Sequence, residues 1–244
     1  MAEIFADASD GLVSSGYQSS WAAARDATSG TVSGVANSTA TPSVYTARGA
    51  ARGGGNTYIV KRMFMWFDTS GITGNVSAAS INIYSTGTSW TSAAQVAKST
   101  AFGGDGGTAL AAGDFDAITG WSAGNNASGN VTEYASLFSG TATLNAYNSF
   151  AGTSDLMADM QNNPVVILCF MDYARDWRNS TWLSNGSVQI SNYFADQSGT
   201  DKDPKIIYTE DASGYTHDIM GVAAGNIGKV INVATANIGK VIGV

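Results

Sequence analysis

The longest hydrophobic runs of this chain predict buried β-strands. Tyr58–Phe67 (YIVKRMFMWF) is apolar on both faces of an extended chain except at Lys61 and Arg62, which predicts a central strand. Gly53-Gly54-Gly55 predicts a hinge or turn before it. Pro164–Tyr173 is the most hydrophobic run and predicts a second buried strand.

Shorter segments with strand character follow the same reasoning. Ser80–Tyr84 alternates between apolar and polar residues, so it predicts a strand with one buried face. Val188–Ile190 and Lys205–Thr209 predict two more short strands. Pro204 cannot donate a ladder hydrogen bond, so it predicts that the last of these strands opens at a sheet edge.

Helical signals are few. Ser154 can cap a short helix over about Asp155–Gln161, and Thr132–Phe138 predicts another turn or two of helix. Gly103–Gly107 and Gly120–Gly129 have the composition of loops.

Many short strands, few helices and glycine-rich loops predict an all-β protein. We expect a jelly-roll β-sandwich with one or two short helices over residues 1–210, a linker over 211–218 and an extended C-terminal tail over 219–244.

The tail is an apolar repeat. The sequence Asn-Ile-Gly-Lys-Val occurs at Asn226–Val230 and again at Asn237–Val241, 11 residues later. Apart from Lys229 and Lys240, the segment from Met220 carries no charge. An apolar surface of this kind is unfavourable in water, and the tail is too thin to form its own core. We therefore expect another surface to bury it.

The conformation and the partner of the tail stay open at this point. Eleven residues fit three turns of a helix, but the glycines each cost up to about 1 kcal/mol there and the β-branched residues favour an extended chain. The tail can fold back on its own domain, or join a sheet edge of a neighbouring copy by β-augmentation. The residues expected to make assembly contacts are its apolar positions, Ile219, Val222, Ile227, Val230, Val233, Ile238, Val241 and Val244.

Composition narrows the class of protein. Charged residues make up 13% of the 244 residues, against about 25% in an average soluble domain. Glycine is abundant, with 29 residues. The net charge of −7 argues against nucleic-acid partners and anionic membrane surfaces. The chain has no run of about 18 apolar residues, so we expect no membrane-spanning helix. No signal peptide is visible. The single cysteine, Cys169, excludes an internal disulfide and is expected to be buried.

Three stretches resemble a known family. Arg62–Tyr84 contains Arg-Met-Phe-Met-Trp-Phe-Asp-Thr-Ser-Gly-Ile and then Val-Ser-Ala-Ala-Ser-Ile-Asn-Ile-Tyr, which resembles the core motif of DNRLRE-type jelly rolls related to carbohydrate-binding modules. Phe170–Trp177 (FMDYARDW) is similar to a strand and loop of phage and environmental members. Tyr193–Tyr208, with its Ser-Gly-Thr-Asp-Lys-Asp-Pro, resembles the closing strand of the family.

This resemblance implies a jelly roll of extracellular, cell-surface or virion proteins, and it covers most of residues 1–210. The tail is similar to Ala-Asn-Ile-x-Lys-Val-x-Gly-Val repeats that end many phage and environmental surface proteins. One departure concerns a tryptophan-rich segment that is usual in secreted bacterial members, of which Gly120-Trp121-Ser122 is the nearest remnant. The departure argues against an adhesin-type sugar site.

Catalytic chemistry has little support in the sequence. The single histidine, His217, lies beside Asp218 in the expected linker, where solvent exposure is the simpler interpretation. No nucleophile-elbow motif is present. The carboxylate pairs Asp114/Asp116, Asp172/Asp176 and Asp201/Asp203 are commoner as turn residues than as a glycosidase pair. We therefore predict no catalytic residues.

No cofactor is predicted, and the metal candidates are confined to one loop. Asp196, Asp201 and Asp203 could hold a structural calcium ion, although their spacing does not match an EF-hand and turn capping is the simpler role. Tryptophans in or beside loops can stack on sugars or anchor protein interfaces. The candidates for either role are Trp121, Trp177 and Trp182.

Taken together, the sequence predicts a non-enzymatic structural protein of extracellular or virion location. It would assemble with copies of itself into a helical filament or a virion appendage (a fibre, tail or decoration). A carbohydrate-binding or host-adsorption module that recognises surface glycans is the first alternative, and a glycan-active enzyme is the weaker one.

Overall fold

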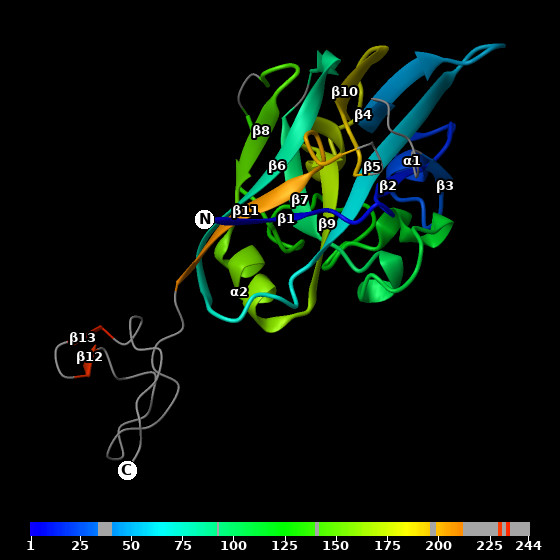
Figure 1. The fold of residues 1–244 in the computed structure, drawn as a ribbon. Coiled ribbons are helices and arrows are strands. Elements are labelled where there is room, and N and C mark those ends of the chain that lie inside the picture. Colours follow the sequence, from blue (N-terminus) through cyan, green and yellow to red (C-terminus); the bar gives the residue numbers. More distant parts are fainter. Residues whose placement is uncertain are drawn as a thin grey trace.

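The structure is a computed structural model that describes residues 1–33, 41–91, 93–139, 142–195 and 199–211, and the backbone of 229–230 and 233–234. Antiparallel β-sheet dominates these residues, and the helices are short (Figure 1). The all-β class and a sandwich-like arrangement are therefore confirmed. None of the helices in the described residues is long and apolar enough to cross a membrane.

The strands of the body are β1 (Ala2–Phe5), β2 (Gly11–Ser14), β3 (Thr31–Ser33), β4 (Thr41–Ala50), β5 (Asn56–Asp68), β6 (Asn75–Trp90), β7 (Ala94–Lys98), β8 (Tyr147–Ala151), β9 (Val165–Asp172), β10 (Gly186–Asn192) and β11 (Lys205–Asp211). The helices are α1 (Trp21–Arg25) and α2 (Ser154–Asn162), with 3₁₀ turns η1 (Phe102–Gly104) and η2 (Ala112–Asp116) and a π-helical turn η3 (Tyr173–Trp177).

The strands form two layers. In the first layer, β6 pairs with β8 on one side and β11 on the other, and β11 pairs in turn with β1. In the second layer, β5 pairs with β2, with β4 along its first half and with β9 along its second half; β3, β10 and β7 extend these pairings. The long β6 joins the layers because its far end pairs with β10.

The inner core lies between the two layers. Alternate side chains of β5 and β9 point into it, as the two-residue period of a strand requires. They meet Ile81 and Ile83 of β6 and Ile206 of β11. The residues that β5 and β9 contribute are Met63, Met65, Phe67, Val166, Leu168 and Phe170.

A second core covers the opposite face of the β5–β9 layer, which we call the outer face. Here Phe64 of β5 and Ile167 and Cys169 of β9 are buried under α1 and the segment 101–131 (Figure 1). This layer of loops and short turns contributes Phe102, Leu110, Phe115, Ile118 and Val131. Because the sheet is covered on both faces, its central strands read as continuous apolar runs rather than alternating ones.

All five predicted strands are present, four of them within longer elements. Tyr58–Phe67 lies in β5 at the centre of the second layer, and Pro164–Tyr173 coincides with β9. The predicted turn Gly53–Gly55 joins β4 to β5 with three positive φ angles. The edge assigned to Pro204 is wrong, because β11 lies between β1 and β6 and the Pro204 carbonyl accepts a hydrogen bond from Ala6.

Two helix predictions need correction. Helix α2 is present, but its N-cap is Thr153, whose hydroxyl accepts from the Leu156 amide, and Ser154 is the first helical residue. Thr132–Phe138 is not helical: it is extended, with β-bridges at Glu133, Ala135 and Phe138. Those bridges satisfy backbone groups that a helix would otherwise pair internally.

The predicted linker and tail lie almost entirely outside the described residues. Asp211 is the last residue of β11 rather than the first residue of a linker. In the tail, β12 (Lys229–Val230) and β13 (Val233–Ala234) form an antiparallel pair across the junction of the two repeats.

Cys169 is fully buried in the outer core, as predicted, and burial raises the pKa of its thiol far above the ordinary value. We expect the thiol to be inert toward a thiol-reactive dye in the native protein and to react fully after unfolding in guanidinium chloride. Rapid labelling under native conditions would show that this face of β9 is open to solvent.

Candidate functional site

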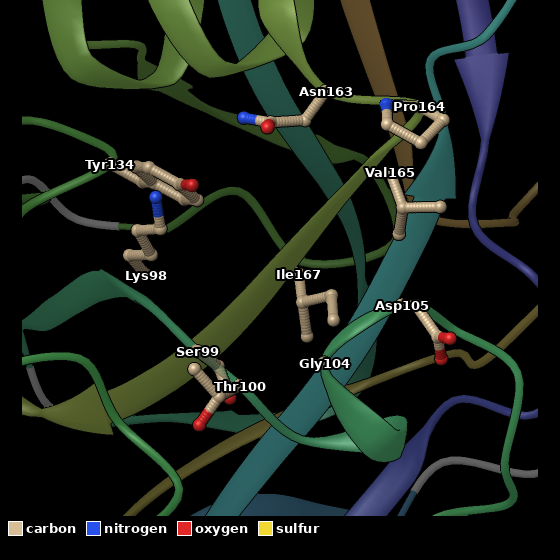
Figure 2. Close-up of a pocket in the computed structure, with 10 residues that line it drawn as sticks. All are labelled: Lys98, Ser99, Thr100, Gly104, Asp105, Tyr134, Asn163, Pro164, Val165 and Ile167. Atoms are coloured by element: carbon tan, nitrogen blue, oxygen red, sulfur yellow. The ribbon is translucent and has the colours of Figure 1, made fainter.

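A pocket of about 260 Å³ lies at the end of the outer face of β9 (Figure 2). Ile167 and Val165 of β9, with Pro164 before them, form its apolar side. Lys98 and Tyr134 lie next to each other at one end, and Asp105 lies at the other (Figure 2). Ser99, Thr100, Gly104 and Asn163 complete the lining.

One wall of this pocket is a hydrogen-bonded network centred on Asp159 of α2. The Lys98 ammonium donates to Asp159 Oδ2 at 2.7 Å, and the Tyr134 hydroxyl donates to the same oxygen. The Asn163 side-chain amide donates to Asp159 Oδ1 at 2.9 Å. Both carboxylate oxygens are therefore occupied, and three lining residues are held in fixed positions.

The protonation states of this wall are also fixed. Burial and the neighbouring Asp159 raise the pKa of Tyr134 far above its ordinary value. Burial pushes the pKa of Asp159 up, but the hydrogen bonds from Lys98 and Tyr134 outweigh it, so this pKa lies below its ordinary value. Near neutral pH the wall therefore holds a phenol hydrogen-bonded to a carboxylate, an arrangement suited to hydrogen bonding rather than to proton transfer.

The lowered pKa of Asp159 predicts a loss of stability in acid. A carboxylate with a depressed native pKa stabilises the fold above its unfolded-state pKa of about 3.9, and that stabilisation disappears as pH falls through the native pKa. We expect Asp159→Asn to be less stable than wild type at pH 7 and to lose less stability on acidification. Urea unfolding at pH 7 and pH 3 measures this, and equal pH dependence in both proteins would contradict it.

A buried ion pair stands beneath the loop layer. Arg62 and Asp176 are both completely buried, and Arg62 Nε and Nη2 donate to the two carboxylate oxygens at 2.8 Å each. Arg62 also binds the carbonyls of Phe115 and Arg25. Arg25, equally buried, donates through Nε to the Asp176 carbonyl at 2.7 Å. We call these three side chains the Arg–Asp cluster; it ties α1, β5, η2 and η3 together.

Burial disfavours the charged form of both arginines, but the net direction of the pKa shift differs between them. For Arg62, the attraction and hydrogen bonds of Asp176 outweigh burial and raise the pKa above its ordinary value. For Arg25, burial dominates, and the pKa is lowered. Since an arginine pKa starts far above neutrality, both guanidiniums stay charged. Asp176 is the fully buried carboxylate that compensates for them, and Arg25 also pairs with the partly buried Asp26 at 2.7 Å.

The three candidate aromatic residues have different environments. Trp177 is 1% exposed and packs in the outer core, so the prediction that it could face a ligand is wrong. Trp121 is partly buried, and its ring contacts the guanidiniums of Arg25 and Arg62 at 4.3 and 4.1 Å from the centroid. Its structural role is to cover the Arg–Asp cluster. Trp182 is partly exposed beside Arg175.

The calcium candidates are not assembled into a site. Asp203 is buried, Asp201 is exposed, and Asp196 lies outside the described residues. Within the described residues, no group of three or more histidine, cysteine, aspartate or glutamate side chains is placed to hold a metal ion.

The other functional candidates are only partly placed. His217 lies outside the described residues. Asp176 is committed to Arg62, and Asp172 caps η3 by accepting from the amides of Ala174 and Arg175. Of the expected assembly residues, only the backbone of Val230 and Val233 is described, and these two residues lie directly opposite each other in the β12–β13 pair.

Sequence reasoning missed the pocket and the Arg–Asp cluster. Arg62 gave a usable signal, because an arginine inside an apolar ten-residue run must be paired if the strand is buried. Lys98, Tyr134 and Asp159 gave none, since 61 positions separate the lysine from the aspartate.

Comparison with known proteins adds no identification. No model of a known protein family matches the chain, and a search of curated proteins finds no match. The resemblance to DNRLRE-type jelly rolls therefore stays a prediction.

Proposed function

We propose that this protein is a non-enzymatic structural subunit that self-assembles through its C-terminal repeat. In this proposal the body is a jelly roll, and the tail links copies into an extracellular helical filament or a virion appendage. The observation that carries the proposal is the 11-residue repeat itself, with matching apolar residues at equivalent positions, such as Ile227 and Ile238 or Val230 and Val241.

The body supports this interpretation because its own residues form two hydrophobic cores. Both cores are built from residues between Ile4 and Tyr208, on the two faces of the β5–β9 layer. A domain of this size buries enough surface to fold by itself. In this proposal the tail that follows makes its contacts with another copy.

The first layer also offers an edge for such a contact. Strand β1 pairs with β11, and its other side has no strand partner among the described residues. An unpaired edge presents backbone donors and acceptors in a row, and a β-rich segment of a neighbour can join it. In register, Ala2 lies opposite Tyr208, so β11 ends at Asp211 close to the first residues of this edge strand.

The polar groups of the body support a non-enzymatic role. The Asp159 carboxylate is occupied by Lys98, Tyr134 and Asn163, and the Asp176 carboxylate is occupied by Arg62. A glycan-active enzyme needs two carboxyl groups free to exchange protons or attack the sugar. The weaker alternative of a glycan-active enzyme therefore gains nothing from these two sites.

Electron microscopy of the purified full chain tests the proposal. We expect filaments or a defined oligomer whose amount rises with protein concentration. Single particles of one 25.1 kDa subunit at every concentration would contradict it.

A glycan-binding module is the second candidate, and the pocket in Figure 2 is the observation that favours it. An apolar side formed by Ile167 and Val165, facing fixed hydrogen-bonding groups, suits a small uncharged ligand with several hydroxyls. A glycan array probed with Asn163→Ala should lose any signal made through this pocket. The matched control is Asn162→Ala, whose side chain binds the Ala158 carbonyl instead, and equal signals from both variants would remove the pocket as the binding site.

A further inference from the structure

The pocket in Figure 2 lies beside a free stretch of strand edge. Strand β7 pairs with β9 only over Leu168–Asp172, because β7 ends at Lys98. The Ile167 carbonyl still accepts from the Ser99 amide at 3.0 Å, but the described residues place no strand beside the first two residues of β9 on this side. The pocket therefore occupies the place that a longer β7 would take.

The backbone of Val165 faces this pocket. Successive carbonyls of a strand point to opposite edges. The Pro164 carbonyl points toward the end of β5, where it accepts from the Thr69 amide, and the Ile167 carbonyl points toward β7. The amide and carbonyl of Val165 therefore point to the same edge as those of Ile167. An extended segment placed here gains backbone hydrogen bonds, as a strand added to a sheet edge does, and this favours a peptide as the ligand.

Side chains reach the pocket from both faces of the β5–β9 layer. Val165 and Ile167 point to the outer face, and Asp105 follows η1, which belongs to the loops that cover this face. Lys98 lies opposite Leu168 and so points to the inner face, where it belongs to the hydrogen-bonded wall described above. An extended segment in the pocket therefore meets an apolar surface and an acid with one set of alternate side chains, and meets the wall with the other.

The charge of this pocket lies at Asp105. This side chain is exposed, its Oδ1 accepts from the Gly107 amide at 2.8 Å, and none of the ion pairs in the described residues involves it. Lys98, by contrast, is paired with Asp159. The pocket thus combines an apolar surface with an acid that can accept a cationic partner.

The repeat offers complementary residues in a matching order. Ile-Gly-Lys occurs at 227–229 and again at 238–240, and Lys229 and Lys240 are the only charged residues over 219–244. In an extended chain the isoleucine and the lysine point to one side and the glycine to the other. Lys229 is the first residue of strand β12.

We propose that an Ile-Gly-Lys segment of the repeat binds this pocket of a neighbouring copy. The isoleucine packs on Val165 and Ile167, the lysine pairs with Asp105, and the glycine passes the wall without a side chain to displace it. The inference rests on the proposed function and names its receiving surface, which takes the pocket from the glycan candidate. Each tail offers two such segments to one pocket, so either repeat can bind, and the head-to-tail contact continues into a ring or a filament.

The test reverses charges across the contact in the full chain and follows assembly by sedimentation velocity at low salt. We expect Asp105→Lys to raise the concentration needed for assembly about tenfold or more, because repulsion replaces attraction. Lys229→Asp together with Lys240→Asp should raise it similarly, and combining all three changes should restore assembly to within about threefold of wild type. Asp201→Lys makes the same reversal at an exposed acid outside the pocket, and it should assemble as wild type does.

A milder variant separates charge from loop folding. Asp105→Asn keeps an acceptor for the Gly107 amide and removes only the charge, so it should raise the concentration needed for assembly about two- to fivefold. Changing Lys229 or Lys240 alone to Asp should have an effect of about twofold, because the other repeat still binds.

The outcomes distinguish this inference from the proposed function. If wild type itself stays monomeric at every concentration, the proposed function fails and the inference fails with it. If wild type assembles and Asp105→Lys assembles as well as Asp201→Lys, the inference is overturned while self-assembly stands. A glycan-array signal that Asp105→Lys loses with its assembly unchanged would assign the pocket to a glycan and would also overturn the inference.

Discussion

The Asp176→Asn variant is expected to lose about 3–5 kcal/mol of its free energy of unfolding, the cost of removing one partner from a buried ion pair. Arg62 and Asp176 are both inaccessible to solvent, and the carboxylate receives two parallel hydrogen bonds from one guanidinium. In the variant, Arg62 keeps its charge without a carboxylate partner, and Arg25 keeps only its ion pair with Asp26 at 2.7 Å. Urea unfolding followed by tryptophan fluorescence measures the loss.

Asp201→Asn is the matched control, because Asp201 is exposed and the same charge is removed; a change within about 0.5 kcal/mol is expected there. The double variant Arg62→Met, Asp176→Leu removes both charges, so its loss should be smaller than the sum of the two single losses. A loss below about 1 kcal/mol in Asp176→Asn, in the range of an exposed pair, would show that water reaches the Arg–Asp cluster.

The double variant Val230→Asp, Val241→Asp is expected to abolish assembly while leaving the body folded. These valines occupy equivalent positions in the two repeats, and burying a carboxylate without a partner costs far more than the apolar contact it replaces. Each single variant should assemble with reduced affinity if both repeats make contacts. Size-exclusion chromatography over a range of concentrations measures the change.

The control introduces the same charges at polar positions of the repeats, with Asn226→Asp and Asn237→Asp. It should assemble nearly as well as wild type, with some weakening at low salt from charge repulsion. Loss of assembly in this control equal to that in the valine variant would mean that net charge, and not apolar contact, governs association.

The sequence predicted the strands that carry the inner core, because a central strand leaves a long apolar run. Tyr58–Phe67 and Pro164–Tyr173 became β5 and β9, paired over Met63–Asp68 and Val165–Phe170. It missed β4, which contains Pro42, Arg48 and the small residues Ala47, Gly49 and Ala50 rather than an apolar run. Its pairing with β5 and β10 is a long-range property that local composition does not carry.

The outer core was missed for a related reason. Its loop layer is built from segments with glycine-rich, polar composition, such as 101–131, in which isolated apolar residues like Phe102 and Phe115 are buried one at a time. Periodicity detects faces of helices and strands, and irregular segments have no period. Trp177 was misassigned in the same way: the sequence placed it in a loop, but the π-helical turn η3 directs it into this core.

The sequence could not predict the pocket or the Arg–Asp cluster, because each is formed by segments that are distant in the chain. Lys98 and Asp159, or Arg62 and Asp176, come together only because strands and turns far apart in the chain are neighbours in space. By contrast, the tail was visible in the sequence because a repeat is a local pattern.

Sedimentation velocity on the full chain and on a chain ending at Asp211 tests the central claim most directly. The cut keeps β11 intact, including the contacts of Glu210 with Thr73 and of Asp211 with Ser77, and it keeps every residue that the two cores contain among the described residues. We predict a large, concentration-dependent species for the full chain and a folded monomer for the shortened one. An assembly of the same size from both chains would contradict a linking role for the repeat.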